Sequence, residues 1–181
     1  MAPPVYSVGQ VVGAADVNSW FLPLAAYKAG ITNRSNTTSR TADPDLALAI
    51  PAGTVYAITC YLSYSTGATS GIGLAFGFTS WSGVSGHWGA AYRVSGDAAS
   101  ASNAGNSGTP DFLWTDFAGS GGQWGAAATP GDSKYHAVLI QGTFINGGAA
   151  GTLSVNWAQD SSNATNLGLS AGCNLIARRI N

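Results

Sequence analysis

The segment from Thr54 to Tyr64 alternates between two sets of side chains. Successive side chains of a β-strand point to opposite faces of its sheet, so a period of two indicates a half-buried strand. The more apolar set is expected to face a core and consists of Tyr56, Ile58, Cys60, Leu62 and Tyr64. The opposite set consists of Val55, Ala57, Thr59, Tyr61 and Ser63. The segment therefore predicts one long strand of a sheet that is covered on one face.

Other segments have the same extended, partly alternating character. They are 45–50, 72–79, 87–94, 112–117, 134–144, 152–159 and 174–180. Turn residues separate them, and no long helical pattern lies between them. About eight strands of this kind predict an all-β chain, an antiparallel sandwich or jelly roll.

Three local patterns refine this prediction. Leu153, Val155 and Trp157 alternate with small or polar residues and are expected to point inward. Asn146 and Gly147 follow the segment 134–144 and form a dipeptide typical of β-hairpin turns. Two glycine-rich stretches are expected to be loops, 95–110 and 119–131.

Charged residues are scarce in this chain. They make up 8 % of 181 residues, with eight aspartates, seven lysines and arginines and no glutamate, whereas about a quarter is usual. The formal net charge is −1, so no long-range field favours nucleic acid or an acidic membrane as a partner. Such a surface is suited to contacts with copies of the chain and with neighbouring proteins.

The N-terminal residues 1–30 differ from the domain expected over 31–181. They combine an extended start with a short helix expected over 14–22, which Pro23 ends. This segment is too short and apolar to be stable alone, so we expect an arm that docks on a neighbour. Its docking residues are expected to be Val11, Val12, Trp20, Phe21 and Leu22.

No part of the N-terminus reads as a secretory signal. The run of about 18 or more apolar residues that a membrane-spanning helix needs is also missing. We therefore expect a chain that stays in the cytosol or leaves it by another route.

The acidic residues offer little for catalysis. Asp43 and Asp45 flank Pro44 and are expected to form a turn into a strand, paired locally with Arg40; a calcium site is the alternative. His87 and His136 are expected to be structural or surface histidines, because no nucleophile motif accompanies them. We therefore predict no enzyme, with no catalytic residue, no metal ligand and no cofactor.

The two cysteines, Cys60 and Cys173, lie in apolar segments far apart in the sequence. They are expected to be buried thiols that behave as small hydrophobes. A disulfide between neighbouring strands is the alternative, in oxidising conditions.

Four tryptophans lie in or beside glycine-rich stretches, and two interpretations stay open for them. They are Trp81, Trp88, Trp114 and Trp124. Such side chains cover the core or a subunit interface, where aromatic rings supply large buried area. Alternatively, they form a stacking platform for sugars of a cell envelope.

Three stretches of the chain are informative together: 11–18, then 36–46 running into 52–56, and finally 151–164 with 172 and 175–180. In these stretches the chain resembles small virion proteins of tailed bacteriophages of actinobacteria. Together the stretches frame most of the chain, but 82–131 matches nothing in that group. The resemblance implies a jelly roll of the TNF/C1q-like, trimer-forming kind, placed on the capsid or the tail as a head decoration or minor tail protein.

These observations lead to one functional prediction and two alternatives. The prediction is a virion structural protein assembled in the host cytoplasm, most simply a homotrimeric capsid decoration or cement protein. Its partners would be itself and the major capsid protein or tail proteins. The first alternative is a tail-tip or fibre knob that binds host cell-surface glycans. The second is a secreted carbohydrate-binding domain.

Overall fold

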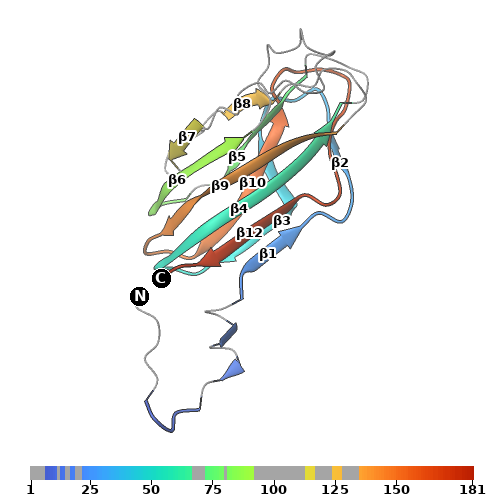
Figure 1. Cartoon of the computed structure of the whole chain (residues 1–181). Coiled ribbons are helices and arrows are strands. Elements are labelled where there is room, and N and C mark those ends of the chain that lie inside the picture. The colour runs from blue at the N-terminus through green and yellow to red at the C-terminus, as the bar shows by residue number, and fades with distance from the viewer. Residues whose placement is uncertain are drawn as a thin grey trace.

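The computed structural model describes residues 7–11, 13, 14, 17, 18, 22–66, 72–79, 81–91 and 135–181, together with the backbone of 113–116 and 124–127. These residues form twelve strands (Figure 1). The strands of the first half are β1 (Leu24–Tyr27), β2 (Thr32–Arg34), β3 (Thr41–Ile50), β4 (Thr54–Ser65), β5 (Leu74–Phe78) and β6 (Val84–Ala91). Those of the second half are β7 (Leu113–Asp116), β8 (Trp124–Ala127), β9 (His136–Asn146), β10 (Gly151–Gln159), β11 (Leu167–Leu169) and β12 (Asn174–Arg179).

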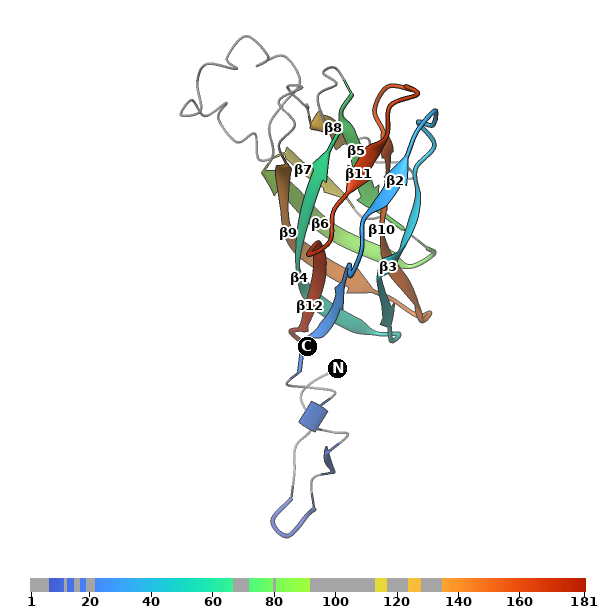
Figure 2. The same ribbon diagram turned by 90° about the vertical axis from the view of Figure 1, so that its right-hand side faces the viewer.

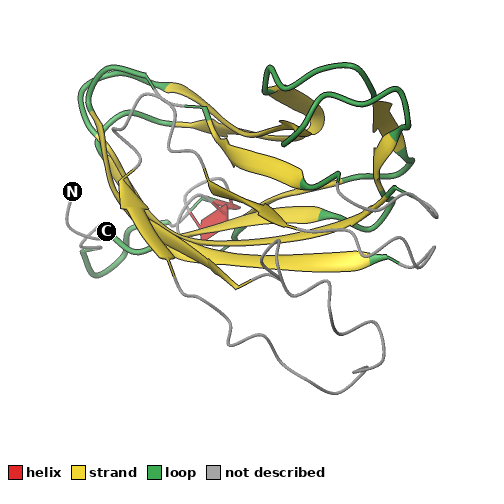
Figure 3. Ribbon diagram, turned by 90° about the horizontal axis from the view of Figure 1, so that it is seen from above, coloured by secondary structure: helices red, strands yellow, loops and turns green. Residues whose placement is uncertain are grey.

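The strands build two antiparallel sheets that form two layers (Figure 3). The large sheet has the order β1-β12-β4-β9-β6-β7, and the small sheet has the order β3-β10-β5-β8. β11 pairs with β2 and with the end of β4, so β2 and β11 extend the β1–β12 pair along the large sheet (Figure 2). The all-β antiparallel fold predicted from the sequence is confirmed.

The core lies between the two sheets and follows the predicted alternation. All five apolar residues assigned to the inner face of β4 are at most 4 % exposed. From the small sheet, Leu153, Val155 and Trp157 point inward, as predicted, and are fully buried. Removing such side chains from water is the main stabilising contribution, about 1.5–3 kcal/mol for each large apolar residue.

The hairpin predicted at Asn146 and Gly147 is wrong. β9, which ends at Asn146, belongs to the large sheet, whereas β10 belongs to the small one. The Asn146 side chain is buried, and its Nδ2 donates a hydrogen bond of 2.7 Å to the carbonyl of Pro51. The Gly147 amide donates to the carbonyl of Gly83 at 2.9 Å. Neighbouring turns therefore satisfy these polar groups, and the chain crosses between the layers there.

Two further predictions need correction. β8 lies within 119–131, which was predicted to be a loop. β1 pairs with β12 within the large sheet, so the residues from Leu24 onward belong to the sandwich and not to the predicted arm. The predicted loop 95–110 lies outside the described residues.

The helix expected over 14–22 is described only in part. Val17 donates a backbone hydrogen bond to Gly13, and Leu22 donates one to Asn18, each at 3.2 Å. This spacing is that of a helix, but the other residues of the segment lie outside the described ones, so the helix stays a prediction. Within the described part of the chain, no helix has the length and apolar character needed to cross a membrane.

Candidate functional site

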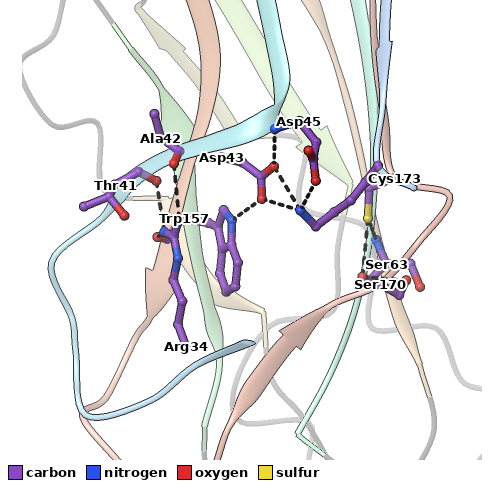
Figure 4. Close-up of polar contacts among 10 residues, drawn as sticks. Arg34, Thr41, Ala42, Asp43, Asp45, Ser63, Trp157, Ser170 and Cys173 are labelled. Atoms are coloured by element: carbon purple, nitrogen blue, oxygen red, sulfur yellow. Dashed lines mark hydrogen bonds and ion pairs between the residues drawn. The ribbon is translucent and has the colours of Figure 1, made fainter. Parts of the chain in front are cut away.

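A buried ionic cluster lies where the edges of the two sheets meet. Lys28 directly follows β1 at the edge of the large sheet, and Asp43 and Asp45 lie on β3 at the edge of the small sheet. The Lys28 ammonium donates to both carboxylate oxygens of Asp43, at 3.1 and 3.0 Å, and to Asp45 Oδ2 at 2.8 Å (Figure 4). The side chains of Lys28 and Asp43 are fully buried, whereas that of Asp45 is 45 % exposed.

Asp43 has two further hydrogen-bond donors. Trp157 Nε1 donates to Asp43 Oδ2 at 2.9 Å, and the Asp45 amide donates to Asp43 Oδ1 at 3.0 Å. Burial raises the pKa of Asp43, but the hydrogen bonds from Trp157, Lys28 and the Asp45 amide, with the Lys28 charge, outweigh it. The pKa of this carboxyl therefore lies below its ordinary value, and Asp43 is ionised at neutral pH.

The Arg34 guanidinium packs over the Trp157 ring. Its guanidinium carbon lies 4.0 Å from the ring centroid, within the range of a cation–π contact. Arg34 Nη1 donates to the carbonyls of Thr41, at 2.9 Å, and of Trp157, and Nη2 donates to that of Ala42 at 3.2 Å. Burial lowers the pKa of Arg34, and the charge of Asp43 partly offsets this. The cluster thus ties β2, β3 and β10 together around one indole.

The sequence prediction for the aspartates is corrected here. Asp43 and Asp45 lie within a strand, not in a turn, and both bind Lys28, which sequence reasoning did not single out. The available signal was a lone lysine in an otherwise apolar segment, 24–30. The same lysine counts against the calcium alternative. The Lys28 ammonium donates to both carboxylates and so occupies the position between them that a calcium ion would need.

Cys60 and Cys173 are free and buried, as the first of their two interpretations predicted. Burial raises the pKa of the Cys60 thiol well above its ordinary value, and the nearby Cys173 adds to this shift. Burial also raises the pKa of Cys173. Both groups are therefore thiols, and not thiolates, at neutral pH.

The four candidate tryptophans do not all lie on one exposed surface. Trp88 is 2 % exposed and packs between Phe76 and Phe78, so it belongs to the core and cannot stack on a sugar. Trp81 is partly buried against the core and lines an open hollow of about 440 Å³ with Thr79 and the 149–152 segment. The side chains of Trp114 and Trp124 lie outside the described residues; their backbones belong to β7 and β8.

The outer face of the large sheet is the surface that points away from the small sheet. One row of outward residues crosses five strands and consists of Tyr27, Asn174, Tyr61, Leu139 and Ala91. Tyr27 is 71 % exposed, Leu139 43 % and Tyr61 39 %. Among the described outward residues of β1, β12, β4, β9 and β6, Arg178 is the one with a permanent charge. The described outer surface of these five strands is therefore broad, weakly polar and nearly uncharged.

The predicted docking residues are described only in part. Val11 is 91 % exposed and Leu22 is 60 % exposed. They precede β1 in a segment that extends away from the sandwich (Figure 2). Val12, Trp20 and Phe21 lie outside the described residues.

Within the described part of the chain, no three His, Cys, Asp or Glu side chains gather in a group that could hold a metal ion. Comparison of the chain with protein-family models, with curated proteins and with solved structures finds no match.

Proposed function

We propose that this chain is a bacteriophage virion structural protein, a homotrimer that decorates the capsid and docks on the shell through the residues before β1. The observation that carries the proposal is the outer face of the large sheet, with its exposed apolar side chains and, among the described outward residues of β1, β12, β4, β9 and β6, one permanent charge. Exposed apolar patches of this kind mark interaction surfaces. The core of a protein interface is likewise depleted in charge and enriched in aromatic residues.

The strand order supports a jelly roll. β1 with β2 counts as one interrupted strand, and so does β11 with β12, because each pair runs in succession along the same neighbours. If the β6–β7 pair is set aside as an insertion, eight strands remain in chain order. The large sheet then has the order first, eighth, third, sixth, and the small sheet second, seventh, fourth, fifth. This order is that of two nested Greek keys, the arrangement of a jelly roll.

The outer face supports self-association. Its exposed aromatic and aliphatic residues spread over neighbouring strands of one sheet, so a second copy could cover them together. Symmetric assembly multiplies such shallow contacts, which suits a chain with few charges. The segment with Val11 and Leu22 supports docking, because its described apolar side chains are exposed and project from one end of the sandwich.

A matched pair of variants tests the trimer. Ala57 lies on the outer face, and Ala49 is an exposed alanine on the small sheet. Ala57→Lys is expected to convert the trimer to monomer in multi-angle light scattering at micromolar concentration, because a charge buried in the interface lacks a partner. Ala49→Lys is expected to remain trimeric. A wild-type chain that is monomeric at this concentration would refute the trimer.

A second experiment tests the position on the particle. Deletion of residues 1–22 removes the segment before β1 and leaves every strand in place. The shortened trimer is expected to lose binding to empty capsids of the phage that carries this chain. The alternative, a glycan-binding knob, makes the opposite prediction. Its binding to host cells would survive the deletion and would be lost in Trp124→Ala.

A further inference from the structure

Lys28 and Asp43 bring a primary amine and a carboxyl group into contact inside the protein. Both side chains are fully buried. Lys28 Nζ lies 3.1 Å from one carboxyl oxygen of Asp43 and 3.0 Å from the other, so it is close to the carboxyl carbon that joins them. Groups held at such distances react as if at very high concentration. We propose that Lys28 and Asp43 join in an intramolecular isopeptide bond between Nζ and Cγ, formed by the folded chain itself.

Asp45 is the residue that moves the protons. Its Oδ2 lies 2.8 Å from Lys28 Nζ and takes one proton from the ammonium, which leaves a neutral amine. Asp45 passes this proton to Asp43, which becomes the neutral acid. The amine then attacks Cγ of Asp43, and Asp45 carries a second proton from the nitrogen to the departing oxygen. The ammonium has three hydrogens: one stays on the amide nitrogen, and two leave with one Asp43 oxygen as water. The reaction needs no oxidant, reductant or other reactant, and Asp45 ends as the carboxylate with which it began.

Two fixed donors stabilise the negative charge that builds up during this attack. Trp157 Nε1–H points at one oxygen of Asp43, at 2.9 Å, and the Asp45 amide points at the other, at 3.0 Å. Donors placed in advance at a developing oxyanion are among the largest contributions to catalysis of acyl transfer. The indole is itself held in place by Arg34, whose guanidinium lies over its ring.

Burial favours the amide over the ion pair. A buried ammonium and carboxylate must both give up their hydration, and their mutual attraction often fails to offset that loss. The amide carries no charge and therefore avoids it. The hydrogen bonds that hold Asp43 ionised act in the opposite direction, because attack requires the neutral acid. Bond formation is therefore expected to follow folding as a separate, slower step.

The bond would join the two sheets at their shared edge. Lys28 belongs to the edge of the large sheet and Asp43 to that of the small sheet. It would anchor β1 covalently just beyond Tyr27, at the end of the strand opposite to the one where the N-terminal segment enters. The inference rests on this cluster alone and does not depend on the proposed virion role.

Mass spectrometry of the intact, denatured wild-type chain tests the proposal without any variant. The expected mass is lower than the sequence mass by one water molecule. Modified Lys28 resists trypsin, so a digest should contain peptide 1–34 joined to peptide 41–93. If prolonged incubation leaves the full mass, with peptides 1–28 and 41–93 separate, the proposal is wrong. A water loss that maps to any other residues refutes it equally.

Variants identify the atoms involved. Lys28→Arg and Asp43→Ala are expected to keep their full sequence masses. Asp43→Asn provides the sharper readout, because the same attack on an amide expels ammonia, so the mass should fall by one ammonia instead of one water. Asp45→Asn is expected to lose water more slowly after refolding, since it lacks the proton carrier. Equal rates in Asp45→Asn and wild type would remove Asp45 from the mechanism.

Discussion

In the Lys28→Arg protein, which excludes the cross-link and keeps Asp43 as a free carboxyl, replacing Trp157 by phenylalanine is expected to lower the free energy of unfolding by roughly 2.5–4 kcal/mol. Trp157 is fully buried, and its Nε1 donates to the ionised Asp43 at 2.9 Å. A hydrogen bond to a charged group contributes about 1.5–3 kcal/mol. The smaller ring leaves a cavity of a few tens of Å³, which adds about 1 kcal/mol at about 24 cal/mol per Å³. Urea unfolding followed by far-ultraviolet circular dichroism measures the total.

The pH dependence of this loss separates its two parts. The cavity contribution does not depend on pH, whereas the hydrogen-bond contribution requires ionised Asp43. The difference between Lys28→Arg and Lys28→Arg/Trp157→Phe should therefore shrink as acid protonates this carboxyl, at pH values below the ordinary aspartate pKa of about 3.9. Val155→Ala is the control, because Val155 is buried and apolar and its loss should be the same at every pH. A Trp157→Phe loss that is equal at neutral and acid pH would refute the reasoning.

Three further predictions concern stability and reactivity. The folded-state pKa of Asp43 is lowered, so the stability that this carboxyl contributes is present above its unfolded-state pKa and is lost as pH falls through its folded-state pKa. Acid titration of the Lys28→Arg protein, which excludes the cross-link, should show this loss of stability. A stability profile that is flat with pH would contradict it. A Cβ on Gly142 would lie 2.4 Å from a carbonyl oxygen of β6, whereas a Cβ on Gly148 would meet nothing within 4 Å. Gly142→Ala should therefore lower the stability measured by thermal unfolding by about 1–3 kcal/mol. A loss of the same size in Gly148→Ala would contradict this. Cys60 and Cys173 should stay unreactive toward a thiol reagent until the protein unfolds, because burial keeps both protonated; rapid native labelling would be the contrary result.

Long alternating strands were predictable from the sequence, whereas most of the shortest ones were not; the four-residue β7, expected within 112–117, is the exception. β4 and β10 were found with the correct inner face because their apolar residues recur at every second position over many residues. β1, β2, β8 and β11 have three or four residues each, too few for a period to be recognised. β1, β8 and β11 pair because longer neighbours offer them free hydrogen-bonding edges, and β2 then pairs with β11, which is a tertiary effect.

The candidate site could not be predicted without knowledge of the sheet topology. Nothing local in the sequence links Lys28 to Asp43, because their contact depends on two sheet edges that meet in space. The burial of Trp88 also depends on register. Trp88 lies opposite Gly142, where an added Cβ would come within 2.6 Å of the Trp88 Cβ, and single-sequence periodicity cannot identify such a cross-strand pair.

The direction in which β1 leaves the sandwich has a mechanical consequence. The preceding segment continues from the Leu24 end of β1, and β1 pairs antiparallel with β12 from Leu24 opposite Ala177 to Tyr27 opposite Asn174 (Figure 1). Tension on that segment acts along the strand, so the ladder is loaded in shear. Its hydrogen bonds must then rupture together instead of unzipping one after another. Such an attachment resists sudden pulling far better than a strand peeled away sideways.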